Sequence, residues 1–293
     1  IRWMYFYPPS GLSWFPGHMT KTRRQIEADL KLVDAVCEIV DARIPVSSRN
    51  PDIDAICGDK PRMIVLNRMD LADPAATKKW AEYFRRKGMA VIATDCKSKK
   101  GISAFTPAAR LACAEKLERD AKRGMNRPLR VMVVGIPNVG KSTLINQISG
   151  RKSAKAENRP GVTRGKQWVT VDSGLQLLDT PGILWPKFED PEVGMMLAYT
   201  GAVKEGVIDL EELAYRLMEL LHKFYPQTLL ERYKVEAPEG TPGWQLLEMA
   251  GRKRGYLVSG GEVNTERMAK VLLDEFRSGK LGNFTLEMPE DMV

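Results

Sequence analysis

The chain has 293 residues, which is enough for one large domain and one smaller domain, each with its own core. Its hydrophobic fraction of 43% and charged fraction of 28% are those of an ordinary globular protein. No apolar run approaches the roughly 18 residues needed to cross a bilayer, which excludes a protein built of membrane-spanning helices. The net charge of +8 and the pI of about 9.2 favour a polyanionic partner.

Cysteine and histidine are too few and too scattered to form a local zinc site. The chain has four cysteines without paired spacing and only two histidines, His18 and His222. Residues 1–14 lack a basic start, a continuous apolar run and a cleavage site, so they do not resemble a secretory signal. We expect reduced thiols and a cytoplasmic location. An organellar location stays open because the sequence does not begin with Met.

The first part of the chain alternates predicted helices and strands. An N-terminal extension, residues 1–16, precedes a predicted helix over 20–32. A second helix is predicted over 74–87, because Asp73 can cap it and Pro74 fits its first position. Strands are predicted at the short apolar runs 35–40, 63–66 and 90–93. This alternation favours parallel βαβ units.

The pattern becomes wholly helical after about residue 190. From 194 to 224, and again from 265 to 277, apolar residues recur at helical spacing. Before that point the chain contains a charged helix at about 103–123, a strand at 131–134, a polar basic loop at 151–164 and strands at about 167–171 and 176–178. We therefore predict an α/β domain over residues 1–188, with a mostly parallel sheet flanked by helices, and a small all-α domain over 189–293.

A phosphate-binding loop carries the chemistry. The apolar strand at 131–134 runs into Gly135-Ile-Pro-Asn-Val-Gly-Lys-Ser142, and a helical pattern follows, which is the context that this motif requires. Its glycines let backbone N–H groups close around phosphate oxygens, and the helix N-terminus adds a favourable partial charge. We expect Lys141 to reach the terminal phosphates and the Ser142 hydroxyl to bind Mg²⁺.

Two further segments indicate a guanine nucleotide. Asp179-Thr-Pro-Gly182 follows an apolar strand, where a carboxylate can hold Mg²⁺ through water and a glycine N–H can contact a γ-phosphate. Asn67-Arg-Met-Asp70 also follows a strand. The Asp70 carboxylate can accept hydrogen bonds from N1–H and the exocyclic amino group of guanine, a pair of donors that adenine lacks. Two such bonds, at about 1.5–3 kcal/mol each, would separate the bases by at least roughly a hundredfold.

In combination these segments resemble a known family. Asn-x-x-Asp, the phosphate loop, a switch threonine and Asp-x-x-Gly are the signature set of Ras-like GTPases, but here the guanine-reading segment precedes the phosphate loop. That order, with Trp14-Phe-Pro-Gly-His-Met19 and Asp41-Ala-Arg-Ile-Pro-Val-Ser-Ser-Arg-Asn50, resembles the circularly permuted GTPases of the YlqF/YawG group over essentially the whole chain. The resemblance implies a P-loop GTPase domain, Mg²⁺-dependent hydrolysis of GTP to GDP, and a function in maturation of the large ribosomal subunit.

The resemblance also implies roles for individual residues. Thr163 matches the switch threonine that closes on Mg²⁺ and the γ-phosphate, and it would act in catalysis with Lys141. Mg²⁺ would be held by Ser142, Thr163 and Asp179. Asn138 lies where such enzymes hold a monovalent cation, so stimulation by K⁺ is expected. The GTP-binding residues would be Asn67, Arg68, Asp70, Thr94, Asp95, Asn138, Val139, Gly140, Lys141, Ser142, Thr143 and Gly182.

Three departures from the family pattern bear on mechanism. Arg68 stands where lysine is usual, and the loop that contacts the guanine carbonyl is represented only by Thr94-Asp-Cys-Lys97. The second switch is followed by Ile183, where a Ras-like enzyme has a glutamine that orients the attacking water. An aliphatic side chain cannot position water, so slow hydrolysis by the isolated protein is expected. His18 is the candidate for that role, and packing near the following helix is the alternative.

Basic residues indicate an RNA partner. They gather in three sets, at 97–100, 151–166 and 252–254, and the second set lies in the loop predicted to close over the nucleotide. No aromatic-rich RNA-recognition strand is evident, so contacts would be mainly to phosphate and shape. Together with the resemblance, these sets favour the large ribosomal subunit and its rRNA as partner. We expect no DNA or membrane partner, and a monomer.

Alternative functions stay open at this stage. The chain could be an RNA-docking scaffold in which bound nucleotide is structural, and Ile183 keeps that alternative open. An ATP-dependent kinase or ATPase is disfavoured by Asp70. In the permuted order the second switch, residues 179–182, leads almost directly into the helical domain. Ordering of this switch on GTP binding is therefore expected to reorient that domain.

Overall fold

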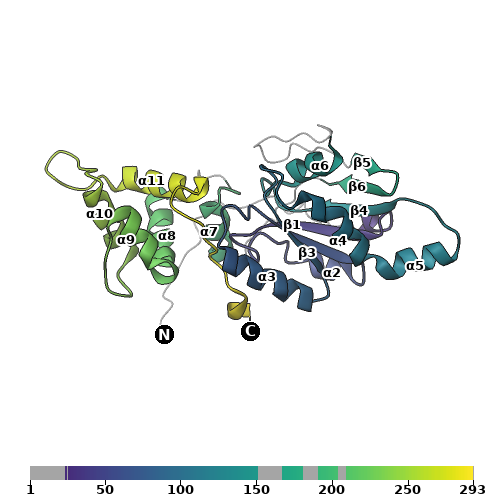
Figure 1. The fold of residues 1–293 in the computed structure, drawn as a ribbon. Coiled ribbons are helices and arrows are strands. Elements are labelled where there is room, and N and C mark those ends of the chain that lie inside the picture. The colour runs from purple at the N-terminus through teal and green to yellow at the C-terminus, as the bar shows by residue number, and fades with distance from the viewer. Residues whose placement is uncertain (1–23, 25, 151–166, 181–190, 204–208, 293) are drawn as a thin grey trace. The chain divides into compact units, whose positions relative to one another are not determined.

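The computed structural model describes residues 24, 26–150, 167–180, 191–203 and 209–292. These residues form two compact units (Figure 1). The first, called here the sheet unit, contains the described residues up to 180 together with 287–292. The second, called the helical unit, contains the described residues from 191 to 286. The chain thus returns to the sheet unit at Glu287 after forming the helical unit.

The sheet unit is built on six described strands, and every predicted strand is confirmed. They are β1 (Ala35–Asp41), β2 (Arg62–Asn67), β3 (Ala90–Thr94), β4 (Leu129–Val134), β5 (Gln167–Asp172) and β6 (Leu175–Asp179). Their order is β3-β2-β1-β4-β6-β5, and among these strands only the edge strand β5 is antiparallel to its neighbour. Every residue of β1 and β2 is buried, as expected of parallel strands covered on both faces. The predicted mostly parallel sheet is therefore confirmed.

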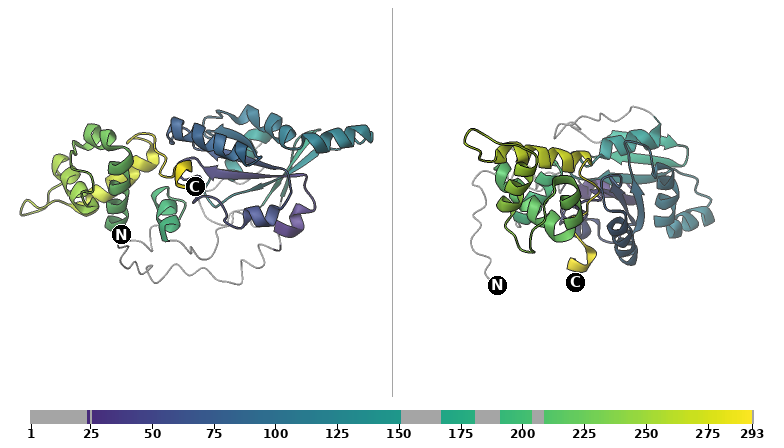
Figure 2. Two further views of the ribbon diagram at one scale, coloured as in Figure 1. Left: turned by 90° about the horizontal axis from the view of Figure 1, so that it is seen from below. Right: turned by 60° about the vertical axis from the view of Figure 1, so that its left-hand side comes forward.

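Helices cover both faces of the sheet (Figures 1 and 2). Residues 26–30 are helical, within the helix predicted over 20–32. The helix predicted over 74–87 is confirmed, and the Asp73 carboxylate accepts hydrogen bonds from the N–H groups of Ala75 and Ala76. The described helices of this unit are α2 (Ile53–Cys57), α3 (Pro74–Arg86), α4 (Phe105–Ala112), α5 (Ala114–Lys122) and α6 (Lys141–Ser149), with the 3-10 turns η1 (Ile102–Ala104) and η3 (Pro289–Met292).

Apolar clusters hold α2 and α3 against one face of the sheet. Ile53 of α2 packs in a cluster with Val36, and Trp80 and Phe84 of α3 pack in a cluster with Ile64. Val36 and Ile64 point to the same side of the sheet, because β1 and β2 pair in parallel and side chains alternate along each strand. Full burial of a side chain such as Phe84 contributes roughly 1.5–3 kcal/mol. The sheet that carries the motif loops is therefore a rigid platform.

The helical unit is organised around one central helix. Its helices are α7 (Pro191–Tyr199), α8 (Leu210–Phe224), α9 (Pro226–Tyr233), α10 (Gly243–Lys253) and α11 (Thr265–Ser278). The other four helices all contact α8. Leu213, Leu217 and Leu221 lie four residues apart on α8 and are completely buried, so they form its apolar stripe. Asp209 and Asn264 cap α8 and α11. The predicted helical character of this region is confirmed.

Two predicted helices are interrupted. The sequence predicts one helix over 103–123, but α4 and α5 are separated at Cys113. Helix α4 buries apolar side chains such as Phe105, whereas no residue of α5 is buried. The helix is therefore interrupted where the chain leaves the sheet. No proline or glycine lies at Cys113 to indicate this interruption in the sequence. The helical pattern over 194–224 is interrupted after Tyr199, where Gly201 adopts a φ of 76° that favours glycine.

The described part of the chain has no helix long and apolar enough to cross a membrane. All four cysteines are buried and none forms a disulfide. Burial raises the pKa of Cys96, which lies close to the motif loops, to about 11. Its thiol is therefore protonated at neutral pH.

Candidate nucleotide-binding site

The site lies at the carboxyl ends of the parallel strands, where the strand order reverses. Strands β1 and β4 are neighbours, with β2 and β3 on one side of this pair and β6 on the other. Loops that leave adjacent strands in opposite directions open a crevice for ligands at such a point. The loops after β1, β2, β3 and β4 and the end of β6 all belong to this edge. Every described residue assigned to the site from sequence lies at the last position of one of these strands, in these loops or in the first turn of α6.

The loop between β4 and α6 has a backbone that requires glycine at two places. Gly140 has a φ of 103°, and a Cβ added to it would lie 2.4 Å from Nδ2 of Asn67. A Cβ at Gly135 would lie 2.6 Å from the Ile39 side chain. Asn138 has a positive φ of 62°, which asparagine adopts more readily than most residues. The spacing of the predicted phosphate loop is thus explained by close backbone approach.

The first turn of α6 is suited to an anion. Gly140 stands at its N-cap, and no side chain caps the helix. The first N–H groups of a helix have no partner within the helix, and the positive end of the helix dipole lies there. Ser142 and Thr143 follow in the same turn and are partly buried. This arrangement fits the phosphate site predicted from the sequence.

Lys141 and Asp179 form a buried ion pair across the site. The Lys141 ammonium donates hydrogen bonds to the Asp179 carboxylate and to the carbonyl of Thr180. The two charged side chains are only 6% and 1% exposed. The Thr180 hydroxyl donates to the Val133 carbonyl at 2.8 Å, which holds the end of β6 against β4. The phosphate loop is thereby joined directly to the start of the second switch.

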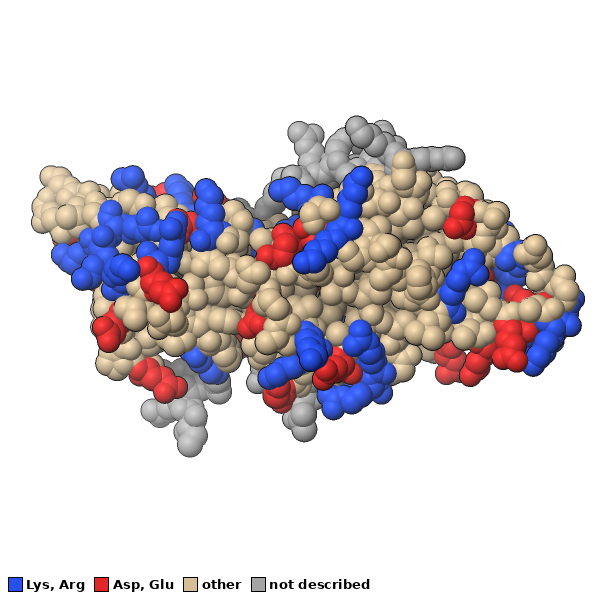
Figure 3. Space-filling model, in the orientation of Figure 1, with Lys and Arg blue, Asp and Glu red and all other residues tan. Residues whose placement is uncertain are grey.

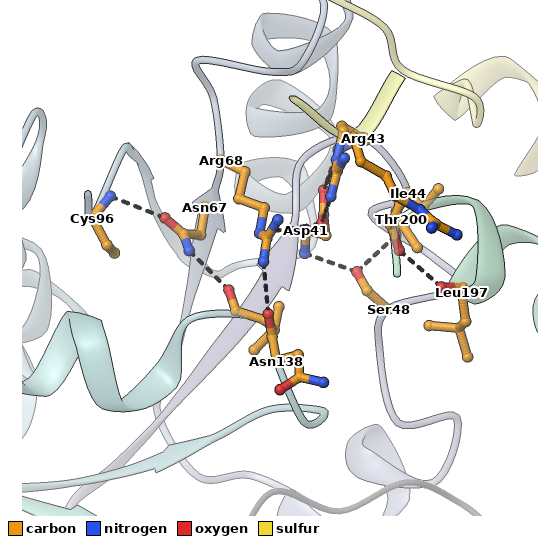
Figure 4. Close-up of polar contacts among 12 residues, drawn as sticks. Asp41, Arg43, Ile44, Ser48, Asn67, Arg68, Cys96, Asn138, Leu197 and Thr200 are labelled. Carbon is orange, nitrogen blue, oxygen red and sulfur yellow. Dashed lines mark hydrogen bonds and ion pairs between the residues drawn. The ribbon is translucent and has the colours of Figure 1, made fainter. Parts of the chain in front are cut away.

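Asn67 joins three loops at the opposite end of the site (Figure 4). Its Nδ2 donates to the Val139 carbonyl of the phosphate loop at 2.8 Å. Its Oδ1 accepts from the Thr94 hydroxyl at 3.1 Å and from the Cys96 N–H at 3.2 Å. The side chain is buried, so these bonds are shielded from water. A single amide therefore fixes the end of β2, the loop after β3 and the phosphate loop relative to one another.

Arg68 adds a second link between the guanine-reading segment and the phosphate loop (Figure 4). Its Nη2 donates to the Asn138 carbonyl at 2.9 Å, and its Nε lies 3.7 Å from Oδ2 of Asp41. Burial lowers the pKa of the Arg68 guanidinium, and the nearby Asp41 carboxylate opposes that shift. A lysine has a single terminal nitrogen and could not make both contacts in this geometry. Arginine in place of the usual lysine thus has a structural role here.

The remaining predicted guanine contacts lie near Asn67 and Arg68, in the segment after β2 and at the end of β3. Asp70 is exposed at the end of the segment after β2. Thr94 is fully buried, and its hydroxyl is bound to Asn67. The Asp95 carboxylate accepts from the N–H groups of Lys97 and Ser98, so it shapes its own turn. Asp70 is therefore the acidic side chain of this set whose carboxylate is open to solvent.

Sequence reasoning missed the side chains that organise the loop after β1, residues 42–50. The Asp41 carboxylate accepts from Nε and Nη2 of Arg43 at 2.9 and 2.7 Å. Burial raises the pKa of Asp41, but Arg43 outweighs this effect and the pKa lies below its usual value. The Ser48 hydroxyl accepts from the Asp41 N–H at 2.9 Å and donates to the Ile44 carbonyl at 2.7 Å. An acidic residue ending a buried strand, with arginine two residues later, was the available signal.

Some predicted residues lie outside the described part of the chain. They include His18, Thr163, Gly182 and Ile183, as well as the basic segment 151–166. Their roles stay predictions. His222, the other histidine, is partly buried, and its Nε2 lies 3.1 Å from the Ala237 carbonyl, as expected of a packed side chain.

Comparison with known proteins identifies the family. A family model described as "50S ribosome-binding GTPase" matches residues 130–227. A ribosome biogenesis GTPase A from Bacillus cereus is 45% identical to this chain, over 96% of the chain and 95% of the relative. The chain belongs to the ribosome biogenesis GTPase A family. A mitochondrial ribosome-associated GTPase 1 from Mus musculus is also similar, with 34% identity over 97% of this chain and 94% of its own length.

A solved structure agrees with the family assignment. The GDP-bound structure of YlqF from Thermotoga maritima matches 92% of this chain and 100% of its own, with 30% identity and a TM-score of 0.65. The predicted circularly permuted P-loop fold, with a helical C-terminal region, is thus confirmed. As a member of the ribosome biogenesis GTPase A family, the protein is a GTPase that converts GTP to GDP and phosphate. The alternative of an ATP-dependent kinase is set aside.

The family implies Mg²⁺ as cofactor, and the described residues fit that ion. The Ser142 hydroxyl lies in the first turn of α6, and the Asp179 carboxylate ends β6 on the neighbouring strand. Oxygen ligands of this kind, combined with phosphate oxygens, are those that Mg²⁺ prefers. The bound ion would neutralise charge on the transferred phosphoryl group. Lys141 would supply a second positive charge from the same turn of α6.

Proposed function

We propose that this GTPase is a switch in maturation of the large ribosomal subunit, slow alone and activated by the ribosomal particle. The observation that carries the proposal is the connection between Asn67, Arg68 and the phosphate loop. Through it, the segment assigned to guanine and the loop assigned to phosphate form one frame. The names of the relatives, which include ribosome biogenesis and mitochondrial ribosome-associated GTPases, support the assembly function. In this proposal residues 1–188 are the GTPase domain, and the helical C-terminal region predicted over 189–293 contacts the ribosome. Its last described residues, 287–292, belong instead to the sheet unit.

Residue roles follow from the same proposal. Lys141 and Thr163 stabilise the transferred phosphoryl group, and Ser142, Thr163 and Asp179 hold Mg²⁺. Asp70 reads guanine, and Gly182 contacts the γ-phosphate. Because Ile183 cannot orient water, we assign that task to His18, placed by the ribosomal particle. Asn138 would hold K⁺ beside the phosphates. We further propose a cytoplasmic monomer.

GTP turnover with and without purified large ribosomal subunits tests this function. In potassium buffer we expect a slow basal rate that rises at least roughly tenfold with subunits, and that falls when Na⁺ replaces K⁺. The His18→Ala variant should keep GTP affinity and lose most of the stimulated rate, because general acid–base or water-positioning groups contribute about 10²–10⁴-fold. The matched control is His222→Ala in the helical unit, which should behave as the wild type. A rate that neither mature nor immature subunits change would favour the RNA-docking scaffold instead.

A basic patch on the helical unit supports contact with rRNA. Figure 3 shows Lys and Arg side chains gathered over α9, α10 and α11. Residues 187–286 contain 13 Lys and Arg against 16 Asp and Glu, so the patch reflects segregation of charge by the fold and not an excess of positive charge. Such segregation creates a local field that attracts phosphate. The exposed basic residues of these helices, and of the positions one or two residues after them, are Arg232, Lys234, Arg252, Lys253, Arg267, Lys270 and Lys280.

Charge reversal in the patch should weaken binding to the ribosomal particle. For the Lys253→Glu/Lys270→Glu variant we expect about tenfold or greater loss of affinity for large subunits, and a shallower dependence of affinity on salt, because fewer counterions are released. Basal GTP hydrolysis should not change. The measurement is sedimentation with subunits at several KCl concentrations. Lys122→Glu on the exposed helix α5 is the control for a surface charge reversal elsewhere, and an equal loss there would contradict a localised RNA surface.

A further inference from the structure

The chain is held where it returns to the sheet unit by the side chain and backbone of Glu287. The Glu287 carboxylate accepts hydrogen bonds from the N–H groups of Val46 and Ser47, at 2.6 and 3.0 Å, and from the Ser47 hydroxyl. Its carbonyl accepts from Nε1 of the fully buried Trp80 at 2.8 Å. Residues 287–292, called here the return segment, are thus attached at the end that follows the helical unit. These contacts lie within the sheet unit.

The carboxylate holds the middle of the loop after β1. Val46 and Ser47 lie in the centre of residues 42–50, and two consecutive backbone N–H groups and one hydroxyl converge on one carboxylate. Hydrogen bonds to a charged acceptor are shorter and stronger than those between neutral groups. Partial burial raises the pKa of Glu287 to about 7, and the hydrogen bonds from Ser47 and Val46 oppose that shift. At pH 8 or above the carboxylate is therefore mainly ionised.

The same loop contacts the guanine-reading segment directly. The Ala42 N–H donates to the Asn67 carbonyl at 2.8 Å. The Ser48 hydroxyl binds the N–H of Asp41, whose carboxylate lies 3.7 Å from the Arg68 guanidinium. The loop is thus in contact with Glu287 at its centre and with Asn67 through Ala42, and it reaches Arg68 through Asp41 at the end of β1. A change in the position of its centre would reach Asn67 and Arg68 through two or three contacts.

We propose that Glu287 is a positioning residue for the guanine site, which acts by holding the loop after β1 against Asn67 and Arg68. The inference rests on the proposed guanine site at residues 67–70. Because Glu287 directly follows the helical unit, the return segment also gives that unit a second covalent connection to the nucleotide site. The first is the segment after the second switch. A partner that displaces the helical unit would thereby act on the base end of the nucleotide as well as on the γ-phosphate end.

The test is nucleotide binding by a Glu287→Ala variant of the full chain at pH 8. We expect about tenfold weaker binding of fluorescent GDP, mainly through faster dissociation. A non-hydrolysable GTP analogue should lose affinity by the same factor, because the affected contacts lie at the base end. The control is Glu290→Gln, which removes an exposed ion pair with Lys79 from the same segment and should leave both affinities unchanged. Unchanged GDP affinity with a lower Tm would show that Glu287 only stabilises the fold, and would overturn the proposal.

A double variant tests the route through the loop. Ser47→Ala alone should weaken GDP binding in the same direction, and Glu287→Ala/Ser47→Ala should be no weaker than Glu287→Ala, because both act through one contact. Additive losses would overturn this route. If Glu287→Ala does not fold, Ser47→Ala and the milder Glu287→Gln carry the test. Asn67→Ala distinguishes the two levels of inference: if it also leaves GDP affinity unchanged, the proposed guanine site itself is wrong.

Discussion

A Lys141→Ala variant should lose GTP binding and also become markedly less stable. The lysine makes charge-assisted hydrogen bonds of about 1.5–3 kcal/mol each, so loss of its phosphate contacts should weaken GTP binding by at least roughly a hundredfold. Its ammonium also pairs with the buried Asp179 carboxylate. Removing one member of a buried ion pair typically costs about 3–5 kcal/mol, because the other charge is left without compensation. Calorimetric GTP titration and urea unfolding measure the two effects separately.

The Lys141→Ala/Asp179→Asn double variant separates these two effects. Replacing Asp179 with the neutral asparagine removes the uncompensated charge, so most of the lost unfolding free energy should return. GTP affinity should stay low, because neither the ammonium nor the carboxylate assigned to Mg²⁺ is present. A double variant as unstable as Lys141→Ala would show that the ion pair does not cause the instability. Recovery of GTP binding would contradict the role given to Lys141.

An Asn67→Ala variant should weaken GDP binding by roughly a hundredfold. Three buried hydrogen bonds link this side chain to the phosphate loop and to the loop after β3, and each contributes about 1 kcal/mol. Their loss would let the base end and the phosphate end of the site move independently. The measurement is GDP affinity by fluorescence titration, together with the dissociation rate.

Asn264→Ala is the matched control for Asn67→Ala. The Asn264 side chain caps α11 in the helical unit by accepting from the Arg267 N–H. Its loss should cost about 1 kcal/mol of stability and leave GDP affinity unchanged. If GDP affinity falls equally in both variants, general loss of stability explains the effect. Wild-type affinity in Asn67→Ala would remove the basis for the proposed frame.

The features that the sequence predicts correctly are those whose signal lies within a short run of consecutive residues. The six strands are apolar runs bounded by polar or turn residues, and the phosphate loop combines a strand, fixed glycines and a helix start within one short stretch. The interruption at Cys113 was not predictable in this way. The interruption occurs because α5 has no buried residues. Whether a helical position is buried depends on where the sheet ends, and no helix-breaking residue in the sequence marks that point.

The contacts that assemble the site were largely hidden from the sequence. Asn67 and Arg68 were predicted to bind GTP, but their bonds to Val139 and Asn138 join residues about 70 positions apart. Asp41 drew notice in the sequence only as part of a stretch that resembles the family. Its ion pair with Arg43 and its approach to Arg68 depend on the turn after β1. Glu287 has no sequence signal at all, because its partners lie near the other end of the chain. Long-range hydrogen bonds of this kind leave no periodic pattern.

The return of the chain to the sheet unit has a consequence for folding during synthesis. Val46 and Glu287 are 241 residues apart, and the helical unit is encoded between them. Chains emerge and fold from the N-terminus, and contacts between distant residues form late because closing a long loop costs entropy. The loop after β1 therefore cannot form its hydrogen bonds with Glu287 until the helical unit has been synthesised. If Glu287 positions the guanine site as proposed, that site is completed only after the helical unit has been translated.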